Sequence, residues 1–328
     1  MSFQAILAHK LEDGTVEASI ETLDESILQE GDVTIDVEWS DVNYKDAIAL
    51  YTPQIIQTSP LIPGIDFAGT VSGSSDPRFS VGDKVVATGW ALSQTHHGGF
   101  SQKARVKGDW LVKLPEAIST RDAMAIGTAG FTAMLSVLAL EHGGITPERG
   151  AILVTGASGG VGSVAVAILA KLGYRVIAST GKADEAEYLT NLGAADIIDR
   201  ASLSEPAAPI AAERWAGAID TVGGQTLANV LAQTSYRGVV TNCGFVGGRE
   251  LPGSVLPFIL RNVTLAGIDS VNAPQQVREE AWARLARDLA PSILASTVSE
   301  VGLAEVQGVV GKMLKGLIRG RTLVDVNR

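Results

Sequence analysis

Residues 152–173 carry the pattern that most restricts how this chain can fold. An apolar run, Ile152–Thr155, leads into a turn containing Gly159 and Gly162, and an apolar helix-like segment follows as far as Gly173. Glycine lets the backbone approach a ligand closely because no Cβ intervenes. The start of the following helix offers free N–H groups and a partial positive charge to an anion. A strand, a glycine turn and a helix in this order predict the pyrophosphate-binding corner of a dinucleotide fold.

Apolar strand-like runs alternate with helix-like segments from residue 151 onward. After the first strand, further strand candidates lie at residues 175–179, 196–198, 218–222, 238–243 and 263–267. Six strands with helices between them predict a doubly wound, six-stranded parallel sheet of the Rossmann type. The near-continuous apolar character of these strands fits a sheet that is buried on both faces.

Residues 1–122 have a different, β-rich character. The segment 33–39 alternates apolar and polar residues, which indicates a half-buried strand, and short turns separate it from later strand candidates. Residues 322–326 read as a strand that returns to this first domain. We therefore predict a β-rich catalytic domain at 1–122, a nucleotide-binding domain at 123–292 and a C-terminal return to the catalytic domain at 293–328.

Composition excludes several classes of function. The chain has 328 residues and a formal net charge of -10, which argues against a nucleic-acid-binding surface. Its single cysteine, Cys243, permits no internal disulfide and no four-cysteine zinc site, and a small buried residue is a better interpretation than a nucleophile. We find no membrane-spanning apolar run and no secretory signal. We therefore expect a cytoplasmic protein.

The end of the second predicted strand indicates the cofactor. Sites for NAD place an Asp or Glu here to bind the ribose hydroxyls, and a carboxylate would repel the additional 2′-phosphate of NADP. This chain has Ser179, Thr180, Gly181 and Lys182 instead, which supply hydroxyl donors and a positive charge. Arg200, after the third strand, is predicted to complete the same pocket. The alternative is that Lys182 and Arg200 are ordinary solvated surface charges.

Segments along nearly the full length together resemble one family. The chain resembles the medium-chain dehydrogenases/reductases, in their quinone-oxidoreductase-like branch, and more narrowly the bacterial NADPH-dependent acrylyl-CoA reductases. The segments that carry this resemblance are Asn43–Ala47, Ile62–Gly69, Asp76–Phe79, Arg105–Leu111, Ile126–Met134 and Pro257–Val263.

The resemblance implies a GroES-like catalytic domain beside a Rossmann domain, and a zinc-free enzyme. Zinc-dependent relatives carry Gly-His-Glu where this chain has Gly64-Ile65-Asp66, and isoleucine has no atom that can bind a metal. The adjacent pair His96-His97 is interpreted as two histidines of a surface loop. Reduction of an activated carbon–carbon double bond needs no metal Lewis acid, unlike the usual oxidation of an alcohol.

The resemblance also implies the reaction and the residues that serve it. We expect hydride transfer from NADPH to the β-carbon of a 2-enoyl thioester, acryloyl-CoA, followed by protonation of the α-carbon to give propanoyl-CoA. Tyr44 is the leading candidate beside the nicotinamide or for proton delivery, and Asn43 for donating to the cofactor or to the substrate oxygen. For Lys45 and Asp46, which follow, a structural salt bridge and a chemical role are equally good interpretations. The predicted cofactor-binding residues are Tyr44, Thr128, Ser158, Gly159, Gly160, Val161, Ser179, Thr180, Gly181, Lys182, Arg200, Phe245, Ile259, Ile268, Ser270 and Asn327.

Two other functions compete with this prediction. A general NADPH:quinone or enone oxidoreductase would use the same hydride transfer on another small-molecule acceptor. An NADPH-binding structural or RNA-binding protein belongs to a different class, and the charge of -10 weighs against RNA. The resemblance further implies a homodimer, formed through the sheet edges of the cofactor domains.

Overall fold

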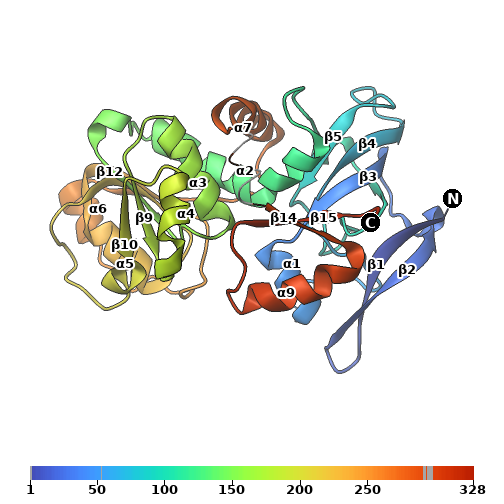
Figure 1. The fold of residues 1–328 in the computed structure, drawn as a ribbon, viewed down its shortest axis with the longest axis horizontal. Coiled ribbons are helices and arrows are strands. Elements are labelled where there is room, and N and C mark those ends of the chain that lie inside the picture. Colours follow the sequence, from blue (N-terminus) through green and yellow to red (C-terminus); the bar gives the residue numbers. More distant parts are fainter. Residues whose placement is uncertain (1, 53, 291–292, 294–297) are drawn as a thin grey trace. The chain divides into compact units, whose positions relative to one another are not determined.

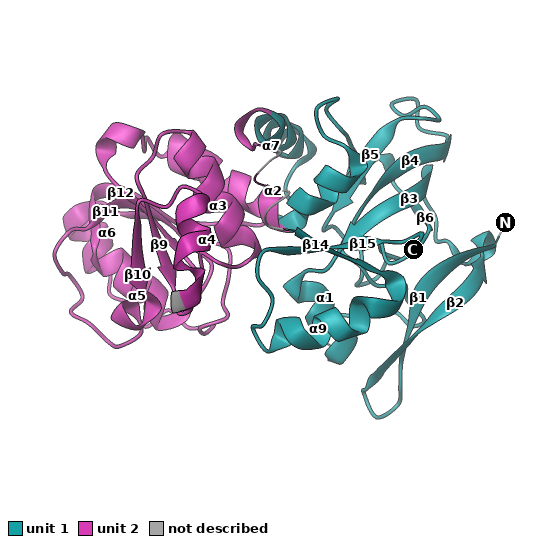
Figure 2. Cartoon of the chain, viewed as in Figure 1, with its two compact units in different colours: residues 1–128, 270–286, 294–328 teal, residues 129–269, 287–293 magenta. Residues whose placement is uncertain are grey.

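The computed structural model describes residues 2–52, 54–290, 293 and 298–328, and the chain forms two compact units (Figure 2). Unit 1 comprises Met1–Thr128, Ser270–Ala286 and Leu294–Arg328, and unit 2 comprises Ala129–Asp269 and Arg287–Ile293. The sequence assigned 270–286 to the nucleotide-binding domain, whereas these residues pack with unit 1. Arg278 accounts for this, because its buried guanidinium donates to the carbonyl oxygens of Thr88, Ser270 and Val271. The predicted boundary at 292/293 adjoins residues outside the described part of the chain.

Unit 1 is built mainly from antiparallel strands, as the β-rich character of its sequence predicts (Figure 1). One sheet has the order β14-β15-β3-β4-β5-β7, with β6 also paired to β3, and β1 and β2 form a separate hairpin. The predicted return strand is present, since β15 pairs antiparallel with β3. Its strands and helices are β1 (Ser2–Lys10), β2 (Val16–Asp24), β3 (Val33–Asp41), α1 (Tyr44–Tyr51), β4 (Asp66–Ser74), β5 (Lys84–Thr88), β6 (Lys103–Val106), β7 (Val112–Lys113), β14 (Val298–Gly302), α9 (Val306–Leu314) and β15 (Arg321–Asp325), with short 3-10 helices at Glu25–Ile27, Gly108–Trp110 and Leu303–Glu305.

Unit 2 is the doubly wound sheet that the sequence predicts. Its six strands are parallel and lie in the order β10-β9-β8-β11-β12-β13. The order reverses at β8, the point where ligands of this fold bind beyond the carboxyl ends of the strands. The elements are β8 (Ile152–Thr155), α3 (Gly160–Lys171), β9 (Val176–Thr180), α4 (Ala186–Asn191), β10 (Asp196–Asp199), β11 (Trp215–Asp220), α5 (Gly224–Ala232), β12 (Thr234–Asn242), α6 (Leu256–Arg261) and β13 (Thr264–Gly267), with 3-10 helices at Pro147–Arg149, Ala183–Glu185 and Arg200–Leu203.

Two long helices contain residues of both units. Helix α7 (Gln275–Asp288) lies mostly within unit 1. Helix α2 (Thr120–His142) is interrupted at Gly127, whose backbone is non-helical with φ of 51°. By length and composition alone, α2 is long and apolar enough to cross a membrane. This run was not identified from the sequence. However, 89% of its apolar window is buried inside the protein, as expected of a core helix.

Candidate functional site

The turn between β8 and α3 in unit 2 has the form that a pyrophosphate requires. A Cβ at Gly162 would overlap the carbonyl oxygen of Gly156, so glycine at 162 lets α3 start directly against the turn. The N-cap residue of α3 is Gly159, which has no side chain to cap the first N–H groups of the helix. These N–H groups are therefore available to an anion. Gly160 and Val161 form the first turn of α3, and the buried Ser158 precedes it.

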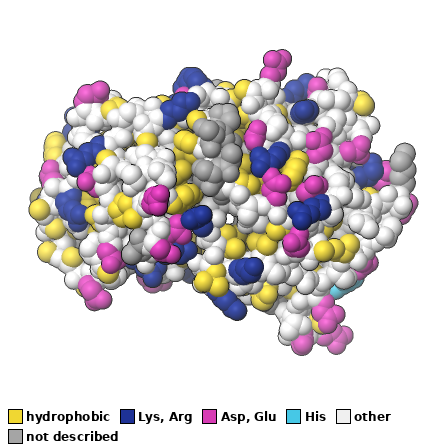
Figure 3. Space-filling model, in the orientation of Figure 1, with side chains coloured by type: hydrophobic (Ala, Val, Ile, Leu, Met, Phe, Trp, Pro, Cys, Tyr) yellow, Lys and Arg dark blue, Asp and Glu magenta, His cyan; other side chains and the backbone are white. Residues whose placement is uncertain are grey.

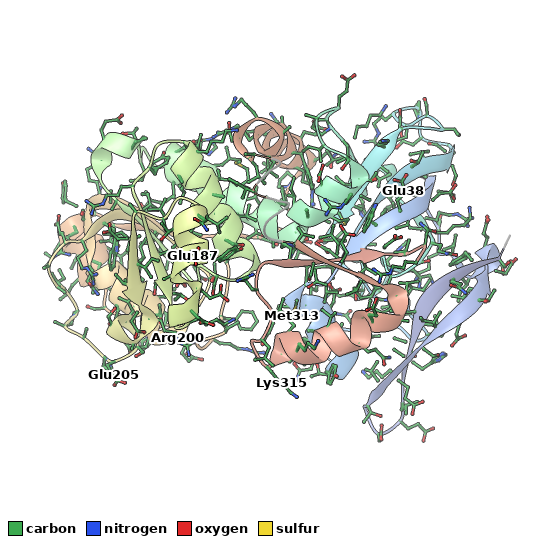
Figure 4. All side chains as sticks on the ribbon, in the orientation of Figure 1. Glu38, Glu187, Arg200, Glu205, Met313 and Lys315 are labelled. Atoms are coloured by element: carbon green, nitrogen blue, oxygen red, sulfur yellow. The ribbon has the colours of Figure 1, made fainter. Side chains whose placement is uncertain are left out.

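The residues predicted to hold the 2′-phosphate lie close together at the end of β9. The Oγ atoms of Ser158 and Thr180 are 3.4 Å apart, and the backbone N–H of Lys182 donates to Thr180 Oγ1 at 3.2 Å. The exposed side chain of Arg200, labelled in Figure 4, lies against Gly181, because a Cβ at Gly181 would overlap it. Ser179 is buried, at 1% exposure, which leaves little of its hydroxyl for a ligand. The structure thus joins four of the five predicted residues into one polar corner.

A buried acidic residue that sequence reasoning missed organises the carboxyl ends of the strands in unit 2. Asp220, at the end of β11, accepts hydrogen bonds from Thr155 Oγ1 at 2.6 Å and from Asn242 Nδ2 and the Gly223 N–H at 2.8 Å each. These bonds link β8, β11 and β12 at the edge where ligands collect. The motif Asp220-Thr221-Val222-Gly223, directly after an apolar strand, was the sequence signal for it.

The remaining predicted residues of unit 2 follow β12 and β13. Phe245 and Ile259 are exposed, at 51% and 69%, and the guanidinium of Arg249 lies 5.4 Å from the centre of the Phe245 ring. The N–H of Ile268 donates to the Asn242 carbonyl at 3.0 Å. Burial, with a smaller contribution from the Asp220 charge, raises the pKa of the Cys243 thiol to about 12. A neutral thiol is a poor nucleophile, which agrees with the structural role predicted for Cys243.

Unit 1 contains a buried polar network around Asn43. Both amide hydrogens of Asn43 are engaged, one by Asp41 Oδ1 at 2.7 Å and one by Asp66 Oδ2 at 2.9 Å. Its Oδ1 accepts from Arg321 Nη1 at 3.1 Å, and Arg321 Nη2 also donates to Asp41. Asn43 therefore has no amide hydrogen left for a ligand, and this geometry favours a positioning role over the predicted donation to cofactor or substrate.

Thr128 and Asp46 complete this network. The N–H and Oγ1 of Thr128 each donate to the Asp66 carboxylate at 2.6 Å. Asp46 accepts from the backbone N–H groups of Asn43 and Ile65 at 2.9 Å, so it fixes the start of α1. Lys45 Nζ donates to Gln94 Oε1 at 3.3 Å, and the salt bridge considered from the sequence stays a prediction.

Tyr44 is the exposed residue of this region. It is the first residue of α1, its side chain is 45% exposed, and within the described residues its hydroxyl has no hydrogen-bond partner. The two other predicted residues of unit 1 make backbone contacts: the Ser270 carbonyl accepts from Arg278 Nη2, and the Asn327 amide donates to the Val37 carbonyl at 3.4 Å. Tyr44 thus retains a free hydroxyl, whereas the side chains of Asn43 and Thr128 are already hydrogen-bonded within the network.

Burial changes the titration of two carboxyls in the network. It raises the pKa of Asp46 to about 7 and that of Asp66 to about 6; hydrogen bonds from Asn43 to both, from Ile65 to Asp46 and from Thr128 to Asp66 oppose the shifts only in part. Burial also lowers the pKa of Arg321 to about 10, which leaves its guanidinium charged at neutral pH. The protonation of these two buried carboxyls therefore changes near neutral pH.

Replacing Asp46 with asparagine should change how the stability of the protein depends on pH. Between about pH 4 and pH 7, the folded protein holds a proton on Asp46 that the unfolded chain has released. The stability contributed by this group is full below pH 4 and is lost as pH rises through 7. The unfolding free energy of the wild type, measured in urea at pH 5, 6, 7 and 8, should therefore fall more steeply than that of Asp46→Asn. Parallel pH curves would contradict this assignment.

The histidines depart from the sequence prediction. His97 is buried rather than on a surface loop: its Nδ1 accepts from the Ile62 N–H and its Nε2 donates to the Ile27 carbonyl, both at 3.1 Å. The imidazole thus satisfies a backbone N–H and a backbone carbonyl inside unit 1. Two adjacent polar residues in the sequence gave no sign that one of them is buried. His96 is half-buried and packs edge-on against Trp110. Among the described residues, no group of three or more His, Cys, Asp or Glu is placed to hold a metal ion.

Two family models match the chain. The alcohol dehydrogenase GroES-like domain matches residues 29–116, and the zinc-binding dehydrogenase model matches residues 160–287. A probable acrylyl-CoA reductase of Escherichia coli K12 is 53% identical over 99% of this chain and 100% of its own length. The chain belongs to the medium-chain dehydrogenase/reductase superfamily. The predicted fold, a GroES-like domain and a six-stranded Rossmann domain, is confirmed.

Other members of this superfamily share the whole length. The acrylyl-CoA reductase of Ruegeria pomeroyi is 50% identical over 99% of both chains, and a putative quinone oxidoreductase of Bacillus subtilis 168 is 46% identical over 99% of both. The crystal structure of the YhdH protein of E. coli K-12 with bound NADPH superposes with a TM-score of 0.96, at 53% identity over 99% of this chain and 100% of that one. The YhfP protein of B. subtilis with NAD bound also reaches 0.96, at 46% identity over 99% and 100%.

Proposed function

We propose that this protein reduces acryloyl-CoA to propanoyl-CoA with NADPH, without a metal. The observation that carries the proposal is its identity, over 99% of the chain, of 53% to a protein named as a probable acrylyl-CoA reductase and of 50% to one named as an acrylyl-CoA reductase. The polar corner of Thr180, Lys182 and Arg200 supports the phosphorylated coenzyme, because it offers cations where NAD sites have a carboxylate. In the overall reaction, one hydride and one proton add across the carbon–carbon double bond, and NADPH becomes NADP+.

In this proposal the residues of the chain hold the coenzyme, orient the substrate and polarise its thioester. NADPH, when bound, supplies the hydride for the β-carbon of the enoyl thioester. The free N–H groups at the start of α3 would hold the pyrophosphate, and Lys182 and Arg200 the 2′-phosphate. The Tyr44 hydroxyl, free of other partners, is our candidate donor to the thioester oxygen, where negative charge develops, or to the α-carbon. Asn43 acts through Tyr44, because it forms the N-cap that begins α1.

One comparison of acceptors tests the function. Oxidation of NADPH should be followed at 340 nm with acryloyl-CoA, crotonyl-CoA and a benzoquinone at equal concentrations. We expect acryloyl-CoA to give the highest kcat/KM, and Tyr44→Phe to lower kcat with it. A quinone that outpaces both thioesters by orders of magnitude would instead support the second candidate, a quinone oxidoreductase, which the 46% identity to the B. subtilis relative favours.

We also propose that the protein is a cytoplasmic homodimer. The strand β13 lies at an edge of the parallel sheet in unit 2, where its outer N–H and C=O groups lack a strand partner among the described residues. An open edge of this kind pairs readily with a second copy. Light scattering should give twice the mass of the 34.2 kDa chain. A monomer at all concentrations would refute the dimer, and recovery in the membrane fraction after cell lysis would refute the location.

A further inference from the structure

A short segment near the C-terminus concentrates positive charge in an acidic protein. Residues 306–324 contain four cations and no Asp or Glu, although the whole chain has a net charge of -10. Arg321 belongs to the buried network, whereas Lys312, Lys315 and Arg319 are exposed. Within the described residues, neither lysine forms an ion pair or a side-chain hydrogen bond. In a protein whose average field repels anions, such a local cluster can attract a polyanionic ligand. We call residues 312–319 the basic segment.

The backbone of the basic segment is fixed by its own hydrogen bonds. Helix α9 ends in a Schellman turn: Gly316 has φ of 69°, its N–H donates to the Met313 carbonyl at 2.9 Å, and the Leu317 N–H donates to the Lys312 carbonyl at 3.1 Å. These two carbonyls are therefore satisfied without help from lysine side chains, so hydrogen bonding to them does not account for Lys312 and Lys315.

The basic segment is connected to helix α1, which carries Tyr44. Before the segment, Gly311 lies against Tyr51, because a Cβ at Gly311 would be 3.1 Å from the Tyr51 hydroxyl. After the segment, Arg321 donates to Asn43, the N-cap of α1. The residues on either side of the basic segment thus contact the two ends of α1, a helix about 12 Å long that begins with the candidate catalytic tyrosine. Figure 4 labels Met313 and Lys315 at this end of α9, and Lys and Arg side chains gather there in Figure 3.

Exposed apolar surface accompanies these charges. Tyr51 is 58% exposed, and Leu317 is 68% exposed. An aromatic face beside lysines suits a nucleotide, because the base can stack on the ring while the ammonium groups contact phosphate. Of the two candidate acceptors, only a coenzyme A thioester carries a nucleotide; a quinone has neither a base nor a phosphate.

We propose that Lys312 and Lys315, with Arg319, bind the phosphates of the coenzyme A moiety of the substrate. This inference rests on the proposed function, since it assigns residues to the far end of the same thioester. The basic segment then accounts for specificity: the small acryloyl group offers little to recognise, and the binding free energy comes from the nucleotide.

Two thioesters that differ only in the nucleotide test this proposal. Kinetics with acryloyl-CoA and with acryloyl-pantetheine, which lacks the phosphates and adenosine, should be compared for the wild type and for Lys312→Glu/Lys315→Glu. With acryloyl-CoA, kcat/KM should fall about 10- to 100-fold, as expected for lost charge-assisted contacts. With acryloyl-pantetheine it should change less than about twofold, a difference too small to signal a lost contact of this kind. Added salt should slow acryloyl-CoA reduction by the wild type more than by the variant.

A matched charge reversal controls for net charge. Lys84→Glu/Lys107→Glu replaces two exposed lysines, and Lys107 follows β6, which pairs with residues 33–36 of β3, whereas β15 pairs with residues 39–41. This variant should behave as the wild type does with both thioesters. Lys312→Ala/Lys315→Ala, with unchanged NADPH affinity as the sign of a folded enzyme, should give the same selective loss in smaller measure.

The outcomes separate this inference from the proposed function. An equal fall with both thioesters, or no fall with either, would overturn the role of the basic segment and leave the reduction of acryloyl thioesters standing. If the wild type reduces neither thioester, the proposed function fails. Direct calorimetric titration with adenosine 3′,5′-bisphosphate does not depend on turnover. Equal binding by the wild type and Lys312→Glu/Lys315→Glu, or no binding by either, would then reject the site.

Discussion

Replacing Arg321 with methionine should lower the free energy of unfolding by about 3–5 kcal/mol. Arg321 is only 3% exposed. Its guanidinium donates to Asp41, to Asn43 Oδ1 at 3.1 Å and to the Ala125 carbonyl at 3.3 Å. Its removal leaves the Asp41 carboxylate buried without its cation, and an uncompensated buried charge is costly. The free energies can be measured by urea denaturation of both proteins at pH 7.5.

Because a buried carboxyl without a cation favours its neutral form, the loss caused by Arg321→Met should shrink as the pH falls from 8 to 5. Arg121→Met is the matched control: this half-exposed arginine pairs with Glu300 at 2.5 Å, and exposed pairs of that kind contribute about 0–1 kcal/mol. A similar small loss for both variants would mean that the buried network does not depend on its cation.

The fold could be predicted further than the site. Strands with a continuous apolar pattern, such as Ile152–Thr155, and the glycine turn after them depend on local sequence, so the Rossmann sheet was predictable and is confirmed. The assignment of 270–286 was not, because it depends on Arg278 reaching Thr88, 190 residues away. Periodicity along the chain contains no information about such a contact.

The same limit applies to the candidate site. Arg200, which follows the third predicted strand, was predicted to complete the pocket that contains Gly181, and its side chain lies against Gly181. The role of Asn43 was misjudged because its partners, Asp66 and Arg321, come from distant segments and use up both amide hydrogens and its oxygen. His97 was misjudged for a similar reason, since burial of a histidine depends on which carbonyl and N–H groups remain unpaired around it. The sequence therefore indicated the role of a charged residue only where its side chain remains on the surface.

The second large effect that we expect is a loss of coenzyme discrimination in Lys182→Ala/Arg200→Ala. Each charge-assisted contact to the 2′-phosphate contributes about 1.5–3 kcal/mol, so kcat/KM for NADPH should fall about 100-fold or more. The value for NADH should change less than about threefold, because NADH carries no 2′-phosphate and the variant removes no contact of this strength from it. Steady-state kinetics with the two coenzymes at saturating acryloyl-CoA give both numbers.

The opposite end of β9 supplies the control for this variant. Lys171 ends α3 and Arg175 directly precedes β9, whereas Lys182 follows β9. Lys171→Ala/Arg175→Ala therefore removes one lysine and one arginine from the other end of β9, away from the predicted pocket. It should leave the preference for NADPH unchanged. The B. subtilis relative was crystallised with NAD. In this chain we expect discrimination between the coenzymes to depend on the side chains at the end of β9. An equal fall for NADPH and NADH in Lys182→Ala/Arg200→Ala would show that these cations support the fold of the corner instead of reading the phosphate.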